Sequence, residues 1–213
     1  MRERPALVLA SASPRRRWLL SRLGLDFIAV GPGLEEELPP RAPHPERLAR
    51  RLARAKALAV AGRYPGCPVL AADTVVVQRG QPLAKPRDAH EAMAMLRRLR
   101  GRWHRVVTAV ALAWGRRLLL GHAITRVLMR RYGEEEIAAY VATGMPFDKA
   151  GAYGIQDEPF LPVAAYEGCY CNVVGLSLAV VIRLLDRAGL AAPEPTPDRL
   201  LPQCLSCPLL GDR

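Results

Sequence analysis

The chain has 213 residues, half of them hydrophobic and about a quarter charged, which is the composition of a folded globular protein. It contains no apolar run near the roughly 20 residues that a membrane-spanning helix requires, so we expect a cytoplasmic protein without a membrane partner. The net charge of +11 fits either a polyanionic ligand or arginines spread over solvated surfaces.

The first half of the chain alternates strand-like and helix-like segments. We expect a buried strand at 6–10, a helix that begins after Ser13 with Pro14 in its first turn, a loop at 31–43 and an amphipathic helix at 45–61. Residues 68–77 look like a strand pair interrupted at 73–74. A helix over 88–99 follows, because Asp88 and Glu91 form a capping box.

The second half of the chain contains a predicted hairpin. Strands are expected at 104–114 and 117–130 around a tight turn at Gly115, followed by a helix at 134–143 and a glycine-rich loop at 148–156. A strand at 161–166, a last helix at 176–187 and a proline-rich tail complete the chain. This pattern predicts an α/β fold with a mixed, twisted sheet flanked by helices.

Hydroxyl and guanidinium groups gather where the first strand turns into the first helix. Ser11, Ser13, Arg15 and Arg16 lie at this turn. A helix N-terminus attracts phosphate through unpaired N–H groups and a partial positive charge, and these side chains add donors. The segment therefore predicts a polyphosphate-binding site, although a plain capped helix with exposed arginines explains it equally well.

Acidic side chains supply candidates for holding a divalent ion. Asp73 interrupts an apolar run, and Glu36 belongs to an acidic loop. Carboxylates bind Mg²⁺, Mn²⁺ or Co²⁺ and orient water for phosphoanhydride hydrolysis. The alternative for Asp73 is an aspartate that caps a turn.

Lysines are rare in this arginine-rich chain, which makes each of them informative. Lys56 lies at the edge of the apolar stripe of its helix, and Lys85 precedes Pro86 in an extended loop. Both are candidates for binding phosphate. The alternative for Lys56 is a stem packed on the protein with its ammonium in water.

Two further motifs carry candidate ligands. In the glycine-rich loop, Gln156 has an amide that can read the edge of a base. The thiols of Cys169, Cys171, Cys204 and Cys207 form two closely spaced pairs, which fit a Zn²⁺ site, disulfides, or the free thiols that are usual in cytoplasmic proteins.

Taken together, these segments resemble the Maf family of nucleoside triphosphate pyrophosphatases. The resemblance rests on six motifs in family order, at residues 9–16, 51–57, 72–76, 85–88, 148–156 and 173–176. It covers a domain at 1–190 and leaves a cysteine-containing tail at 191–213 outside.

The resemblance implies a metal-dependent enzyme that cleaves between the α- and β-phosphates, with its active site in a cleft between two lobes, and a homodimer. It implies that Asp73 is the catalytic carboxylate with Glu36 as its acidic partner. Ser13, Arg16, Lys56 and Lys85 would bind phosphates and stabilise charge on the leaving pyrophosphate.

Three positions also indicate a branch of the family. The branch that acts on dTTP and UTP has Arg, Thr and Gln where the 7-methyl-GTP branch has Trp, Gln and Glu. This chain has Arg15, Thr74 and Gln156 at these positions. The resemblance therefore implies pyrimidine triphosphates, including modified ones, as substrates, and a role in cleaning the nucleotide pool.

A regulator without catalytic activity, bound to nucleic acid or linked to septum control, is the main alternative. Such a module would concentrate arginines on one face among aromatic residues. Aromatic residues make up only 6% of this chain and its arginines are scattered, so we expect no nucleic-acid partner.

Overall fold

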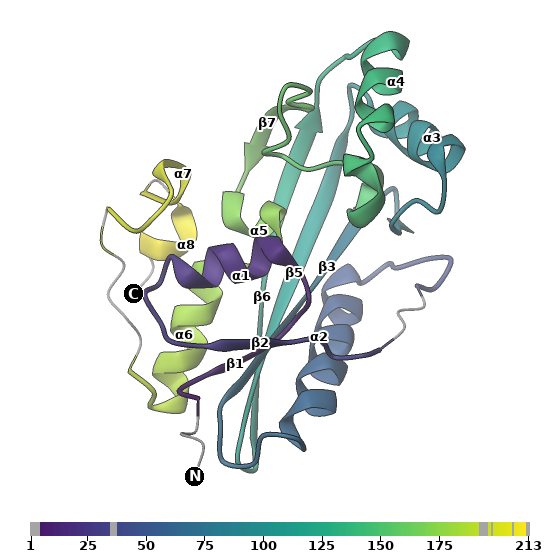
Figure 1. The fold of residues 1–213 in the computed structure, drawn as a ribbon. Coiled ribbons are helices and arrows are strands. Elements are labelled where there is room, and N and C mark those ends of the chain that lie inside the picture. The colour runs from purple at the N-terminus through teal and green to yellow at the C-terminus, as the bar shows by residue number, and fades with distance from the viewer. Residues whose placement is uncertain (1–4, 35–37, 192–195, 197, 206, 212–213) are drawn as a thin grey trace.

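The structure is a computed structural model, and it describes residues 5–34, 38–191, 196, 198–205 and 207–211 (Figure 1). Its strands are β1 (Val8–Ala10), β2 (Ile28–Val30), β3 (Val69–Gln78), β4 (Gln81–Leu83), β5 (Trp103–Trp114), β6 (Arg117–Met129) and β7 (Val163–Glu167). Its helices are α1 (Pro14–Ser21), α2 (Pro45–Ala61), α3 (Ala89–Leu99), α4 (Glu134–Ala142), α5 (Tyr170–Val174), α6 (Leu178–Ala188), α7 (Pro202–Leu205) and α8 (Pro208–Gly211), with the 3₁₀ helices η1 (Met145–Asp148) and η2 (Ala150–Ala152).

The seven strands form one mixed sheet in the order β2-β1-β3-β5-β6-β7, with β4 paired to β3. β1 runs parallel to β2 and β3, whereas β3, β5, β6 and β7 pair antiparallel. The β5–β6 hairpin turns at Gly115, whose φ of +57° favours glycine. The predicted mixed α/β sheet flanked by helices is confirmed.

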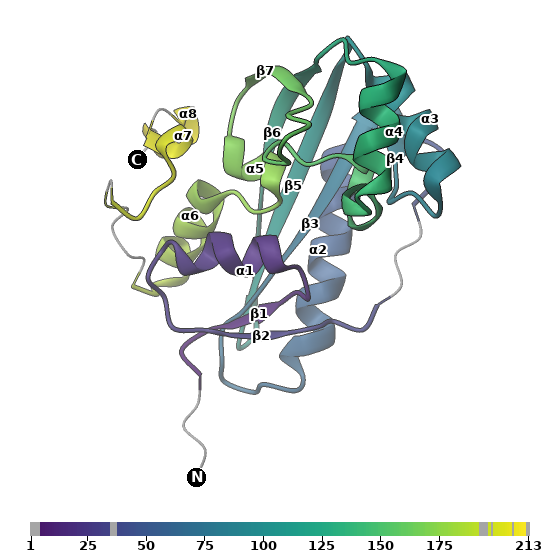
Figure 2. The ribbon, with the colours of Figure 1, turned by 45° about the horizontal axis from the view of Figure 1, so that its top comes forward.

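Side chains alternate between the two faces of each strand, and this alternation decides what each face contacts. On β1, Leu9 packs in one cluster with Leu19 of α1 and Leu185 of α6. Its neighbour Val8 packs in a second cluster with Ala53 of α2. α2 therefore covers one face of the sheet, while α1 and α6 cover the other (Figures 1 and 2).

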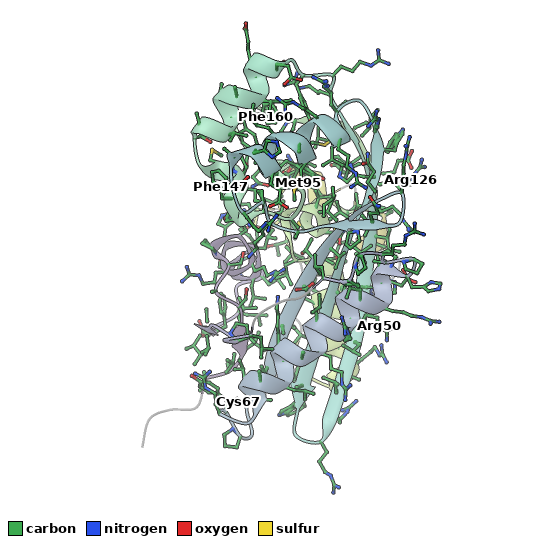
Figure 3. The ribbon with its side chains drawn as sticks, turned by 90° about the vertical axis from the view of Figure 1, so that its right-hand side faces the viewer. Arg50, Cys67, Met95, Arg126, Phe147 and Phe160 are labelled. Atoms are coloured by element: carbon green, nitrogen blue, oxygen red, sulfur yellow. The ribbon has the colours of Figure 1, made fainter. Side chains whose placement is uncertain are left out.

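A third hydrophobic cluster lies beside α3 and α4. It contains Phe160, which stacks on Tyr140 with ring centroids 4.2 Å apart. Met95, Phe147 and Phe160 lie toward one end of the molecule, and Cys67 lies at the opposite end (Figure 3). The cleft between two lobes that the resemblance implies stays a prediction.

Residues 68–77 do not form the predicted strand pair interrupted at 73–74. β3 is one continuous strand, in which Asp73 and Thr74 pair in register with Ala109 and Thr108 of β5. Asp73 is therefore in the middle of a strand and not at a strand end or in a turn. The reason is long-range, because Lys56 supplies the buried carboxylate with a cationic partner.

The tail contains short helices that the sequence does not predict. α7 contacts α5, and α8 contacts α6. Leu200, Cys204 and Cys207 are buried in the same cluster as α1 and α6. Within the described ranges, no helix combines the length and the apolar character needed to cross a membrane.

Candidate active site

The candidate residues gather around an open stretch on the edge of β3. β1 pairs with β3 at Val69 and Leu70, and β4 pairs with it at residues 76–78. Between these pairings, the described strands leave the β1 side of β3 uncovered. The chain leaves β1 beside this gap and turns into α1. The gap therefore brings the N-terminus of α1 close to the middle of β3.

Asp73 and Thr74 point to opposite faces of the sheet, as neighbours in a strand must. Asp73 shares the face of Ala71 and Val75, which pack in the cluster with α2. Thr74 shares the face of Ala72, which packs in the cluster with α1 and α6. The two residues consequently contact different helices. A ligand at the open edge of β3 can reach side chains on both faces of the sheet.

Lys56 and Asp73 form a buried ion pair. Lys56 Nζ donates to Asp73 Oδ1 over 2.6 Å, and the two residues are only 5% and 2% exposed. The interpretation of Lys56 as a packed stem with its ammonium in water is therefore wrong. Taking two charges out of water is costly, so a buried pair is poor evidence of a purely stabilising role and is typical of a functional site.

Arg16 connects α1 to β3 and to the end of α5. Its Nε donates to the carbonyl oxygen of Gly175 over 2.9 Å, and its Nη2 donates to Thr74 Oγ1 over 3.2 Å. Gly175 has a φ of +129°, which only glycine adopts readily. This glycine lets the chain turn so that its carbonyl faces Arg16, and the guanidinium is held over the open edge.

Buried polar groups that the sequence analysis did not single out support Thr74. Thr74 Oγ1 lies 2.9 Å from Thr108 Oγ1, and Thr108 Oγ1 donates to the carbonyl oxygen of Asn172 over 2.8 Å. The Asn172 side chain accepts from Thr108 N and donates to Val106 O and Thr125 Oγ1. In the sequence, Thr108 and Asn172 are recognisable only as polar residues within apolar segments. That pattern does not show which groups they bind.

We predict that Asn172→Leu lowers the free energy of unfolding by about 3 kcal/mol, because it leaves several buried strand groups without hydrogen bonds. Urea denaturation measures this loss. The matched control is Val173→Ala on the same helix, which removes no hydrogen bond and should cost about 1 kcal/mol. A loss below 1 kcal/mol in Asn172→Leu would mean that other groups replace its hydrogen bonds.

The N-terminus of α1 is capped as predicted. Ser13 Oγ accepts from Arg16 N over 3.5 Å, and Ser11 Oγ accepts from Ser13 N over 3.2 Å. Pro14 occupies the first turn. The cap fixes the direction of the first N–H groups of the helix, which is what binding of an anion requires.

Arg15 reaches the first residue of the glycine-rich loop at 148–156. Its Nη1 donates to Asp148 Oδ2 over 2.6 Å, and Lys149 Nζ donates to Asp148 Oδ1 over 2.8 Å. Partial burial raises the pKa of Asp148, but hydrogen bonds from Lys149 and Arg15 outweigh it and hold the pKa below its ordinary value. The two candidate substrate-binding segments are thus connected through one carboxylate.

Gln156 is held at the end of the glycine-rich loop. Its Nε2 donates to Asp157 Oδ1 over 2.8 Å, and Asp157 Oδ2 accepts from Tyr140 over 2.5 Å. A carboxylate oxygen can only accept here, so the amide is oriented with Oε1 pointing away from Asp157. Within the described part of the chain, this buried Oε1 has no hydrogen-bond partner.

Of the other two predicted catalytic residues, Lys85 lies in the described part of the chain. Lys85 is exposed in the segment between β4 and α3, where Ala84 O accepts from Gly151 N over 3.0 Å. Lys85 therefore stands beside the glycine-rich loop. Glu36 lies outside the described residues.

The cysteines do not have the arrangement expected for zinc. Cys171 Sγ lies 2.6 Å from Cys204 Sγ, whereas sulfurs on one tetrahedral Zn²⁺ are about 3.8 Å apart. Among the described residues, no group of three or more His, Cys, Asp or Glu side chains is arranged to hold a metal ion. The predicted Zn²⁺ at these cysteines is therefore not supported.

Comparison with known proteins identifies the family. The sequence profile of the family described as Maf-like protein matches residues 6–188. This chain belongs to the Maf family. The Maf match includes each candidate residue discussed above except Cys204 and Cys207, which lie in the tail.

Similar Maf proteins are named dTTP/UTP pyrophosphatase. One from Thermomicrobium roseum is 59% identical over 203 residues, covering 95% of this chain and 93% of its own length. One from Myxococcus xanthus is 50% identical over 187 residues, covering 88% and 94%. One from Symbiobacterium thermophilum is 47% identical over 183 residues, covering 86% and 94%. The first of these alignments is longer than residues 1–190, so it extends into the tail.

Proposed function

We propose that this protein hydrolyses dTTP and UTP to the nucleoside monophosphate and pyrophosphate, and thereby removes unwanted pyrimidine triphosphates from the nucleotide pool. The observation that carries the proposal is the buried ion pair between Lys56 and Asp73, whose Nζ and Oδ1 atoms are 2.6 Å apart. The next residue on the same strand, Thr74, accepts a hydrogen bond from Arg16. The names of the relatives support the same activity.

In the proposed reaction, a water molecule attacks the α-phosphorus. Asp73 orients this water and takes its proton, while Lys56 keeps the carboxylate in place. The bond from the α-phosphorus to the bridging oxygen breaks, and its electron pair leaves with pyrophosphate. Arg16, Lys85 and the N-terminal N–H groups of α1 stabilise the charge on the phosphates.

A divalent ion such as Mg²⁺, Mn²⁺ or Co²⁺ fits the residues around Asp73. Mg²⁺ characteristically uses one or two protein carboxylates and completes its shell with water and substrate phosphates. Asp73 offers one carboxylate, and we propose Glu36 as the second. When bound, the ion neutralises phosphate charge and makes the α-phosphorus easier to attack.

We further propose that Gln156 recognises the base. Uracil and thymine carry an N–H donor at N3, whereas cytosine has an acceptor there. Because Asp157 holds Nε2, Oε1 of Gln156 is the acceptor left for this N–H, and since Oε1 is buried, the loop around it would have to open for the base to reach it. Arg15 and Thr74 complete the pyrimidine-specific set that the resemblance implies.

Gln156→Glu should lower kcat/KM for dTTP and UTP about 10- to 100-fold, because it removes the donor to Asp157 and places a second negative charge beside it. Steady-state rates with dTTP, UTP, dCTP and GTP measure the effect. Gln203→Glu on the exposed tail is the control for the charge change. An unchanged nucleotide profile in Gln156→Glu would exclude Gln156 from base recognition.

The nucleotide preference of the native protein tests the proposed substrate. We expect kcat/KM to be highest for dTTP, UTP and modified pyrimidine triphosphates among a panel that includes purine triphosphates and 7-methyl-GTP. A preference for 7-methyl-GTP would assign the chain to the other branch.

The setting of this activity is also part of the proposal. We propose a cytoplasmic enzyme that acts as a homodimer, does not require nucleic acid, and carries its catalytic residues in a domain at 1–190. Light scattering of the purified protein measures the oligomeric state.

A further inference from the structure

Four of the five cysteines come together where the tail meets the enzyme body. Cys169 and Cys171 lie at the start of α5, and Cys204 and Cys207 lie in and just after α7. All four are buried, with Cys171 and Cys204 at 0% and 1% exposure. Two sequence-distant thiol pairs therefore share one apolar cluster, whereas Cys67 lies in a different cluster.

The tail is held against the body by other contacts as well. Leu200 is buried in the cluster that includes α6, and Leu209 and Leu210 pack against that cluster. Arg22 Nε donates to the carbonyl oxygen of Arg199 over 2.6 Å. Figures 1 and 2 show α7 and α8 beside α6 at the edge of the fold. The cysteines therefore meet in a docked arrangement and not at a loose chain end.

The thiol contacts favour pairing between body and tail. Cys171 Sγ and Cys204 Sγ are 2.6 Å apart. This distance is shorter than that between two non-bonded sulfurs or between two sulfur ligands of one Zn²⁺, and it is nearer to the roughly 2.0 Å of a disulfide bond. A hydrogen bond to Cys169 raises the pKa of Cys207, so these two thiols are neighbours too. Cys169 and Cys171 also contact each other within the body, and the other two contacts each join one cysteine of the body to one of the tail.

We propose that Cys171 and Cys204 form a disulfide that fastens the tail to α5. The reaction consumes a small-molecule disulfide such as oxidised glutathione. The thiolate of one cysteine attacks this disulfide, forms a mixed disulfide and releases one small thiol. The second cysteine then attacks the mixed disulfide and releases the other small thiol. The two cysteines lose two electrons in total, the oxidant gains them, and the two thiol protons leave with the released thiols.

The proposed bond has a structural consequence for the body. α5 carries Asn172, the residue after Cys171, whose hydrogen bonds reach Thr108 and, through it, Thr74. Since all four thiols are buried once the tail is docked, the exchange takes place while α7 and α8 are undocked. The bond would then close a loop that contains the whole of α6 and restrict the unfolded chain.

Mapping the cross-link in the full chain tests the proposal directly. Protein oxidised with glutathione disulfide during refolding, and protein kept reduced, are digested with trypsin without reductant and analysed by mass spectrometry. We expect the oxidised sample to contain peptide 150–183 linked to peptide 200–213. The link should persist in the double variant Cys169→Ser/Cys207→Ser, and it should disappear when Cys171→Ser or Cys204→Ser is added to that double variant.

Thermal unfolding supplies an independent readout. Oxidation should raise the Tm of the native protein and of Cys67→Ser by roughly 5–15 °C, and leave the Tm of Cys204→Ser unchanged. Five free thiols after oxidation would overturn the proposal. So would about one equivalent of zinc retained by the reduced protein together with resistance of the cysteines to oxidation, because the four thiols would then be metal ligands.

Discussion

Asp73→Asn should reduce kcat at least about 1,000-fold while the protein remains folded. The amide keeps the size and shape of the carboxylate and can still accept a hydrogen bond from Lys56. It cannot take a proton from water or bind a divalent ion as a carboxylate does. Steady-state hydrolysis of dTTP measures the activity, and circular dichroism measures the fold. Near-native turnover would remove Asp73 from the mechanism.

The same substitution also disturbs a buried ion pair, so lost stability must be separated from lost chemistry. Replacing one partner of a buried pair costs about 3–5 kcal/mol, whereas replacing both with neutral groups costs much less. The double variant Asp73→Asn/Lys56→Met should therefore regain much of the stability lost in Asp73→Asn. Its activity should stay at the level of the single variant. Activity that recovers with stability would show that Asp73 acts only through the fold.

Lys56→Met should lower the free energy of unfolding by about 3–5 kcal/mol and kcat/KM by about 100-fold or more. The residue is 5% exposed, and its ammonium lies 2.6 Å from Asp73, so the substitution removes a cation in direct contact with a buried carboxylate. Urea denaturation and dTTP hydrolysis measure the two effects.

Arg54→Met is the matched control for Lys56→Met. Arg54 lies two residues earlier on α2 and is exposed, so this variant loses the same charge from the same helix but leaves the site untouched. Its stability should change by no more than about 0.5 kcal/mol. Equal losses in the two variants would mean that net charge, rather than the buried pair, decides stability.

Elements determined by local signals are predictable from this sequence. α2 spans 45–61 as predicted, because Pro45 suits a first turn and the apolar stripe has helical spacing. The β5–β6 hairpin follows from two long apolar runs around Gly115, and α3 begins after its predicted cap Asp88. In each case a residue near the end of the element marks its boundary.

Features that depend on distant partners are not predictable in this way. A carboxylate in an apolar run looks like a strand break, yet β3 continues through Asp73 because Lys56 approaches from α2. β2 and β4 are too short to show a strand pattern, and pairing with β1 and β3 defines them. The tail looks like a loop because of its prolines, but buried Leu200 and Cys204 attach it to the body.

In the candidate site, too, the residues are predictable from local sequence but their contacts are not. Motif residues such as Ser13, Arg16 and Gln156 can be found from their local context. Their geometry cannot, because Arg16 is fixed by Gly175 and Thr74 at distant positions in the chain. Thr108 and Asn172 look like ordinary polar residues until the fold places them behind Thr74.

Identification of the products is the most direct test of the proposed reaction. The purified protein is incubated with dTTP and Mg²⁺ in water labelled with ¹⁸O, and the products are resolved by mass spectrometry. The proposed attack on the α-phosphorus predicts dTMP carrying one labelled oxygen, together with unlabelled pyrophosphate. Labelled orthophosphate with dTDP, or label in the pyrophosphate, would contradict it.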